Sequence, residues 1–277
     1  MSSLLALPGE IRNKIYQFVL TSPDALRYRE SSKRIQKPIF YSLGSQRAEH
    51  GDENEQSEFN ELKYVNKQLY NETAALELKY NVLRFNGHPS DKLPAIANLT
   101  NFLGSIATTR KAWLRTIMLD DCIPPPSHGG TESFYSKPIA SATAIASLSH
   151  ACRQNPHIRV RYVLSYWANN SLRKRKSAFL LQGLYLAEAI RQQHHCPLIF
   201  GAGTPTLNLF MRDIANETGR WRGDVPASAM QAPNLRFMPS EDTTWNWHDW
   251  HSYASSIIVQ DIYQVLALTE GWVRDGI

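Results

Sequence analysis

Segments with the spacing of helices alternate with short apolar segments along most of the chain, and this alternation limits the fold more than any other feature. Helical patterns cover residues 93–107, 139–155, 177–193 and 206–216, and strand patterns follow them over 113–119, 157–167, 197–200 and 234–238. Strand starts recur at intervals of roughly 40 residues, which leaves room for the helical crossover of a dozen or more residues that a parallel pair needs. The sequence therefore predicts an α/β fold with a small, mostly parallel sheet.

The handedness of parallel crossovers predicts where the helices lie. Sequential parallel connections are right-handed, so strands added in chain order would place their helices on one face of the sheet. The result would be a curved, repeat-like stack, with a final helix over residues 258–273 as its cap. No Leu-x-x-Leu-x-Leu consensus accompanies this order, so a comparison with leucine-rich repeats rests on architecture alone.

The opening segment "LPGEIRNKIYQFVL" predicts an amphipathic helix. Pro8 suits the first helical position, Glu10 complements the helix dipole, and Ser22-Pro23 ends the element. One apolar arc is formed by residues Leu4, Leu7, Ile11, Ile15, Phe18 and Val19. Tyr16 and Leu20 lie on the opposite side. Apolar groups on two sides indicate two contacts, one within the chain and one elsewhere; the alternative is that the chain itself covers both.

A second helical pattern covers residues 61–80, and a short strand follows over 82–85. Asn81 is predicted to end this helix because Asn tolerates the left-handed conformation. Between the two helices, residues 21–60 are rich in Ser, Gln and Asn, basic early and acidic late. This insert reads as an exposed loop, in which the apolar segment "KPIFYSL" (residues 37–43) is a candidate strand.

The two helical segments together resemble the paired signature of a large fungal group of F-box-like proteins. That group carries a Leu-Pro-x-Glu-Ile-Arg-x-x-Ile-Tyr opening and, further on, a Val-x-Lys-Gln-x-Tyr-x-Glu helix that leads to Tyr-x-x-Asn-x-(Leu/Phe)-x-Phe. The matching positions are Leu7, Pro8, Glu10, Ile11, Arg12, Ile15 and Tyr16, then Val65, Lys67, Gln68, Tyr70, Glu72, Tyr80, Asn81 and Phe85.

The resemblance implies a function and a division of the chain. In F-box proteins the opening helices bind the Skp-type adaptor of a cullin ubiquitin ligase, and the rest of the chain holds a protein substrate. Residues 1–88 would then be the F-box-like helical region, with its insert at about 21–60, and residues 89–277 the α/β partner-binding region. The implied adaptor contacts are Leu7, Pro8, Ile11, Ile15 and Val19.

Composition indicates a globular protein with reduced thiols. Hydrophobic residues make up 43 % of the 277 residues and charged residues 20 %, enough to expect a packed core. The net charge of +5 comes from 30 basic residues interleaved with 25 acidic ones, which does not favour a nucleic-acid partner. The three cysteines, Cys122, Cys152 and Cys196, are few and far apart, which argues against a disulfide framework. We recognise no secretory signal and no apolar segment long enough to span a membrane, so the expected location is cytoplasmic or nuclear.

Three short stretches invite a chemical reading. "FGAGTPT" (residues 200–206) suggests a phosphate loop, but its glycine spacing fits an ordinary strand-to-helix turn instead. In "WNWHDWH" (residues 245–251), His248 and His251 could share a helix face as metal ligands, although tryptophans more often anchor a loop to a core. "LRKRK" (residues 172–176) could be a nuclear signal or contact phosphates, although a solvated loop before the next helix is the favoured interpretation.

Three functional readings follow. The first is an F-box-like interaction module that acts as a substrate adaptor of a cullin ubiquitin ligase. The second is a stand-alone interaction or structural protein that keeps the F-box-like helix in its core. The third is an enzyme, although no nucleophile elbow, paired-carboxylate or cysteine-protease signature is readable, and no cofactor or metal is expected.

Overall fold

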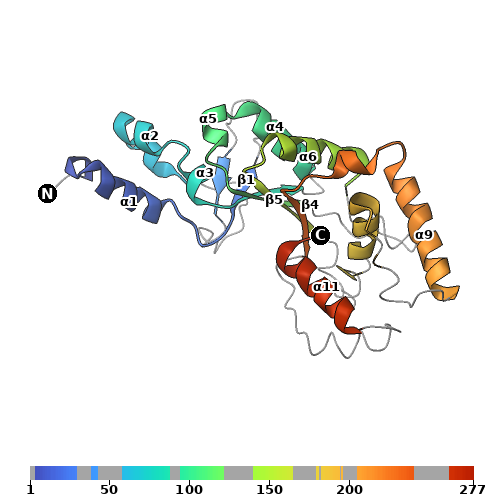
Figure 1. Ribbon diagram of the computed structural model, residues 1–277. Coiled ribbons are helices and arrows are strands. Elements are labelled where there is room, and N and C mark those ends of the chain that lie inside the picture. The colour runs from blue at the N-terminus through green and yellow to red at the C-terminus, as the bar shows by residue number, and fades with distance from the viewer. Residues whose placement is uncertain are drawn as a thin grey trace, which may run out of the picture.

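A computed structural model of the chain describes residues 4–29, 39–42, 58–87, 94–121, 140–164, 179–180, 182–193, 195, 205–239 and 262–277 (Figure 1). These residues form an α/β fold around a six-stranded sheet. The strands are β1 (Leu26–Arg29), β2 (Ile39–Tyr41), β3 (Leu83–Gly87), β4 (Thr116–Asp121), β5 (Arg159–Leu164) and β6 (Leu235–Pro239). The mostly parallel sheet predicted from the sequence is confirmed.

The strands lie in the order β2-β1-β3-β4-β5-β6. The β1–β2 pair is antiparallel, and every other pair is parallel. The predicted strands over 82–85, 113–119, 157–167 and 234–238 correspond to β3 to β6, and the "KPIFYSL" segment contains β2. The strand predicted over 197–200 lies outside the described residues. Because β3 pairs with β4, the expected boundary between residues 88 and 89 falls within one sheet.

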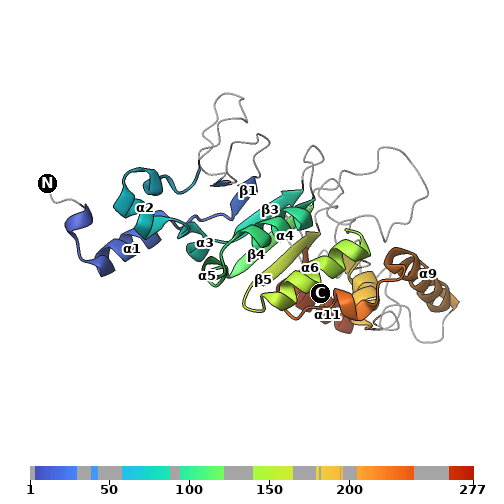
Figure 2. The same cartoon turned by 90° about the horizontal axis from the view of Figure 1, so that it is seen from above.

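The two faces of the sheet differ in chemistry, and this difference decides where helices pack. In register across β3 to β6, one face presents Phe85, Leu119, Tyr162 and Phe237, all buried. This apolar face is covered by α4 (Ala95–Ser105) and α6 (Ala142–Gln154), which lie side by side above the sheet in Figures 1 and 2. The opposite face, reached by the residue before each of these along its strand, presents Arg27, Arg84, Arg161 and Arg236, with Met118 of β4 between Arg84 and Arg161.

The crossover from β5 to β6 is the longest in the fold. Residues 182–186 are helical and lead into a π-helical turn, η4 (Ala187–Arg191). After it come α9 (Pro205–Arg222), which extends six residues past the predicted 206–216 helix, and the short η5 (Ala227–Met230). The short α5 (Thr108–Lys111) connects α4 to β4.

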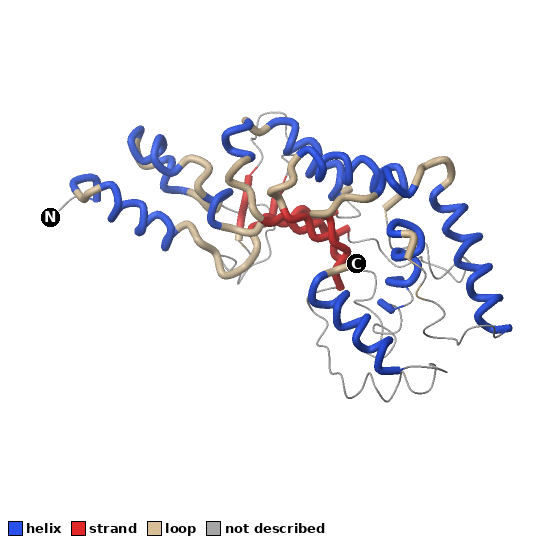
Figure 3. Tube along the Cα trace, in the orientation of Figure 1, coloured by secondary structure: helices blue, strands red, loops and turns tan. Residues whose placement is uncertain are grey.

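The last helix, α11 (Ile262–Asp275), lies on the other side of the sheet from α4 and α6 (Figures 1 and 3). The one-sided stack expected from strand order therefore holds for α4 and α6 but not for α11. The chain end explains this position, because Ile277 exchanges backbone hydrogen bonds with Phe237 of β6, at N–O distances of 3.0 and 3.3 Å. Gly276 just before it adopts φ +81° and passes close to Arg236.

The single helix predicted over residues 61–80 is wrong, because the segment breaks into three. These pieces are η3 (Glu61–Tyr64), α2 (Lys67–Thr73) and α3 (Glu77–Tyr80). Asn66 starts α2 as its N-cap, accepting a 2.9 Å hydrogen bond from the Leu69 amide. Ala75 turns the chain between α2 and α3 with φ +73°.

Asn81 ends α3 as its C-cap, as the sequence predicts, but for a different reason. Its backbone is extended (φ −122°, ψ 158°) instead of left-handed. The buried amide side chain donates to the carbonyl oxygens of Leu20 (2.7 Å) and Glu77 (2.9 Å) and accepts from the Ser22 amide (2.6 Å). Asn81 therefore ties the end of the opening helix to the start of β3.

An N-terminal arm projects from the β1–β2 end of the sheet (Figures 1 and 2). We define the arm as η1 (Leu4–Ala6), α1 (Gly9–Val19), η3 and α2. Its own small hydrophobic cluster has Tyr16, Leu20 and Leu69 at the centre, separate from the large cluster beneath α4 and α6. Phe59 packs against both clusters and connects the arm to the body.

Candidate functional site

Within the arm, α1 packs against the other elements through the side opposite its main apolar arc. Tyr16 is 1 % exposed and Leu20 is 2 % exposed, and both pack against Leu69 of α2. Leucines at the arm's start and on η3, together with Leu76 and Tyr80, close this cluster. The contact within the chain that the sequence predicts for one side of the opening helix is therefore made by Tyr16 and Leu20.

A polar clamp fixes the rotation of α1 on α2. Arg12 donates from Nε to Glu72 Oε2 and from Nη2 to Glu72 Oε1, both at 2.9 Å. The Tyr16 hydroxyl donates to Glu72 Oε2 at 2.6 Å, and Gln68 donates to Oε1 at 3.0 Å. These hydrogen bonds, led by that from Arg12, lower the pKa of Glu72 to about 2.

Arg12 also closes the entry to the helix. Its Nη1 donates to the Leu7 carbonyl oxygen at 2.6 Å, just before α1 begins. The Ncap residue of α1 is Pro8, which has no side-chain hydrogen-bond acceptor, so the cap supplies no such contact. The guanidinium thus joins the chain before α1, α1 itself and α2 into one unit.

The apolar arc of α1 points away from the chain. Phe18 is 86 % exposed, Val19 49 % and Ile11 43 %, and Ile15 between them is half-buried. Residues at i, i+4, i+7 and i+8 share one helix face, so these four side chains form a single stripe. Their exposure contrasts with the buried side, where the polar clamp and the cluster lie.

All five predicted adaptor contacts lie in the arm, and none is buried. Pro8, Ile11 and Val19 are exposed, and Leu7 and Ile15 are half-buried. Phe18, the most exposed large apolar side chain in the described residues, was not among these predicted contacts although it belongs to the apolar arc. Its spacing of seven residues from Ile11 is the sequence signal that places it in the stripe.

The neighbouring elements add further exposed apolar groups. Tyr64 and Val65 at the end of η3 are 68 % and 66 % exposed, and Tyr70 of α2 is 49 % exposed. Most exposed large hydrophobic side chains of the described chain therefore belong to the arm, with Tyr263 of α11 as the other case. Scattered exposed apolar residues are ordinary, whereas a concentration on one element marks an interaction surface.

The other stretches that the sequence analysis considers for chemistry lie largely outside the described part of the chain. Residues 172–176, 200–204 and 245–251, with Cys122 and Cys196, lie outside the described residues. Cys152 is buried, and burial raises the pKa of its thiol to about 12, so it is unreactive. Within the described part of the chain, no group of three or more His, Cys, Asp and Glu side chains could hold a metal ion.

Comparison with protein-family models, curated proteins and solved structures finds no match to this chain. Among the described residues, no helix is both long and apolar enough to cross a membrane. The features that bear on function are therefore the geometry of the arm and the residues that carry the F-box-like resemblance.

Proposed function

We propose that the chain is an F-box-like interaction module whose α1 face binds a Skp-type adaptor of a cullin ubiquitin ligase, while the α/β portion holds a protein substrate. The observation that supports this proposal most is the outward position of Ile11, Phe18 and Val19. The same helix carries the Leu-Pro-x-Glu-Ile-Arg-x-x-Ile-Tyr resemblance. The motif's Arg12 and Tyr16 hold the helix, and its Ile11 faces outward.

The chemistry of the stripe suits a protein partner. Aromatic side chains at the centre of an interface contribute much of its binding energy, and Phe18 supplies such an anchor. The clamp at Glu72 holds α1 in one orientation before any partner arrives, which reduces the entropy lost on binding. The surface is therefore both apolar and preorganised.

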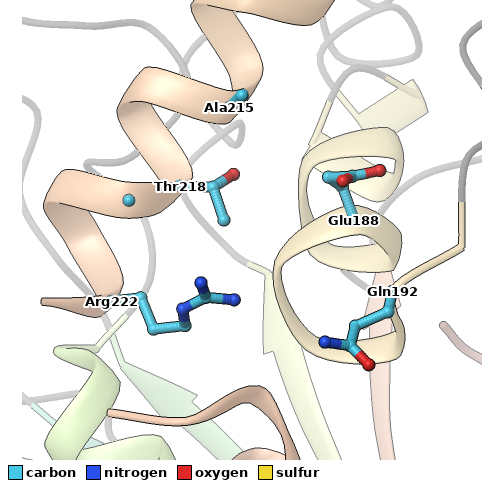
Figure 4. Close-up of a pocket in the computed structure, with 6 residues that line it drawn as sticks. Glu188, Gln192, Ala215, Thr218 and Arg222 are labelled. Atoms are coloured by element: carbon cyan, nitrogen blue, oxygen red, sulfur yellow. The ribbon is translucent and has the colours of Figure 1, made fainter. Parts of the chain in front are cut away.

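The alternative, a stand-alone interaction or structural protein, predicts that the outward face of α1 is buried. A protein that keeps this helix as core should bury the Leu7–Val19 face, but Ile11 and Val19 are exposed. An enzyme reading would gain support from a pocket with converging His, Asp or Ser groups. The described pocket of about 420 Å³ is lined by none of these residue types (Figure 4).

The test is binding to a purified Skp-type adaptor, measured by calorimetry. Phe18→Asp places a charge at the centre of the stripe, and we expect it to weaken binding at least about tenfold, or about 1.4 kcal/mol. Tyr263→Asp is the matched control, because Tyr263 is 74 % exposed on α11 and lies outside the arm. We expect the control to bind like the natural chain.

Folding must be equal for this comparison to be meaningful. Circular dichroism and thermal unfolding of Phe18→Asp should match the natural chain, since an 86 % exposed side chain contributes little to packing. Absence of adaptor binding by the natural chain would overturn the proposal. Equal binding by Phe18→Asp and Tyr263→Asp would do the same.

A further inference from the structure

A buried carboxyl group lies at the joint between the arm and the body. Glu77 begins α3, which stands between the arm and the sheet in Figures 1 and 2, and its side chain is buried together with that of Asn60, the residue before η3. Phe59, the neighbour of Asn60, packs against both hydrophobic clusters, and its amide donates to the Phe40 carbonyl oxygen of β2 at 2.8 Å. The two side chains, Asn60 and Glu77, form a joint pair where the arm is attached to the sheet.

The joint pair connects the elements of the arm. The Asn60 side chain donates from Nδ2 to Glu77 Oε2 at 2.7 Å and to the Thr73 carbonyl oxygen, at the end of α2, at 2.8 Å. The backbone carbonyl of Glu77 accepts at 2.9 Å from the Asn81 side chain, which also donates to the Leu20 carbonyl oxygen at the end of α1. Because α1, α2 and η3 all meet α3 through these contacts, a change at Glu77 reaches the whole arm.

The joint pair lacks a hydrogen-bond donor when Glu77 is ionised. Within the described part of the chain, the buried Asn60 Oδ1 has no hydrogen-bond partner. A carboxylate only accepts hydrogen bonds, whereas a protonated carboxyl group also carries an O–H donor. An amide and a carboxylic acid can therefore exchange two hydrogen bonds, one in each direction. Since a buried acceptor without a partner costs free energy, this pairing favours the protonated form of Glu77.

The charges around Glu77 do not offset its burial. Burial raises the pKa of the Glu77 carboxyl, against the opposing effects of the Asn60 hydrogen bond and the Lys63 charge. Lys63 of η3 is hydrogen-bonded to Glu58, which also accepts from the Tyr64 hydroxyl and, as a like charge, disfavours ionisation of Glu77. Among the described residues, no ion pair includes Glu77. A buried carboxylate without a paired cation is costly, so the geometry and the charges agree.

We propose that Glu77 is a pH-sensitive latch for the arm. With its proton, the carboxyl group pairs with Asn60 through two hydrogen bonds and holds η3 against α2 and α3. As pH rises, the proton passes to solvent, Asn60 Oδ1 is left unsatisfied beside a buried charge, and the joint loosens. The latch belongs to the fold of the arm and is independent of whether α1 binds an adaptor.

Linkage fixes the direction of the pH effect. A carboxyl group whose pKa is raised in the folded state stabilises the fold fully below its unfolded pKa of about 4.3, and this stabilisation is lost as pH rises through the folded pKa. Glu72 acts in the opposite direction, because its pKa is lowered to about 2. Between about pH 5 and about pH 8 Glu72 stays ionised, so this range separates the two carboxyl groups.

The experiment compares amide hydrogen exchange of the natural chain and of Glu77→Gln at the same pH. Glutamine is neutral at every pH and carries a donor for Asn60 Oδ1, so it mimics the protonated latch. The ratio of the two exchange rates removes the intrinsic pH dependence of exchange. For α1 and α2 we expect this ratio, natural chain over variant, to rise at least about threefold from about pH 5 to about pH 8. For β4 and β5 it should stay constant.

A matched control and a direct titration complete the test. Glu61→Gln removes an exposed carboxylate of η3, and its exchange ratio should not change with pH. The carboxyl carbon NMR signal of Glu77, followed in the natural chain and therefore independent of how any variant folds, should titrate above the ordinary value of about 4.3. A midpoint at or below that value would overturn the proposal. So would a pH-independent ratio for α1 and α2, or an equal rise for Glu61→Gln.

Discussion

At the scale of single residues, the Glu72 carboxylate joins α1 to α2 because it accepts hydrogen bonds from three side chains. Arg12 and Tyr16 of α1 and Gln68 of α2 all donate to it. The pKa of Glu72, lowered to about 2, lies below the value of about 4.3 expected in an unfolded chain. Folding of the arm therefore favours the ionised form.

This difference predicts how the arm responds to acid. A carboxyl with a lowered folded-state pKa stabilises the fold above its unfolded pKa, and the contribution is lost as pH falls toward its folded pKa. The amide NMR signals of α1 should keep native shifts near pH 5 and lose them as pH approaches about 2. In Glu72→Gln the arm should be loosened at every pH and show no such transition. Glu61→Gln, at an exposed carboxyl of the same arm, should behave like the natural chain.

The polar clamp also shows how much of the arm could be predicted from the sequence at the scale of single residues. Arg12, Tyr16 and Glu72 were all identified as positions of the F-box-like resemblance, but nothing in the sequence indicated that residues 60 apart meet. The helical spacing of α1 identified its apolar arc and the opposite side, yet spacing alone cannot decide which side faces the chain. That choice is made by the tertiary contacts of Leu69 and Glu72.

For helices and strands, the period of apolar residues predicted most of the architecture. It failed for β1, whose "LRYR" pattern places arginines on alternate positions and so lacks an apolar run. It failed again between α2 and α3. There the side chain of the buried Asn60 donates to the Thr73 carbonyl oxygen at 2.8 Å, in place of a backbone N–H from a further helical turn. In both cases a contact distant in sequence overrides the local preference.

A close approach of two helical segments gives a test of packing. A Cβ on Gly183 would clash with the buried ring of Trp272 on α11, so Gly183→Ala should destabilise the chain by about 1–3 kcal/mol. Gly104→Ala is the matched control, since nothing lies within 4 Å of its Cβ position on α4. The control should raise stability by about 0.5–1 kcal/mol because alanine favours the helix. Urea unfolding measures both; an unaffected Gly183→Ala would show that the two segments are not in contact.

For the whole molecule, the decisive property is that it has two hydrophobic clusters of very different size. The body cluster joins all the parallel strands with α4 and α6, whereas the arm cluster has three buried members in the described part of the chain, Tyr16, Leu20 and Leu69. Regions with few buried contacts open at lower free energy than the core. The arm should therefore open without the body, while its outward stripe is presented on an otherwise stable scaffold.

Hydrogen exchange measured by mass spectrometry can separate the two clusters. Leu69→Ala and Leu99→Ala each remove a buried side chain, from α2 and α4, and each should lower local stability by about 2–5 kcal/mol. Leu69→Ala should speed exchange in α1 and α2 at least tenfold (about 1.4 kcal/mol) and leave β4 and β5 protected. Leu99→Ala should speed exchange in the strands as well. If Leu69→Ala exposed β4 and β5 as much as α1, the arm and body would unfold as one unit, and a surface on the arm could not be lost without loss of the sheet. Among the described residues, Phe59 is the one side chain that packs against both clusters, so its replacement by alanine should loosen the arm in the same pattern as Leu69→Ala.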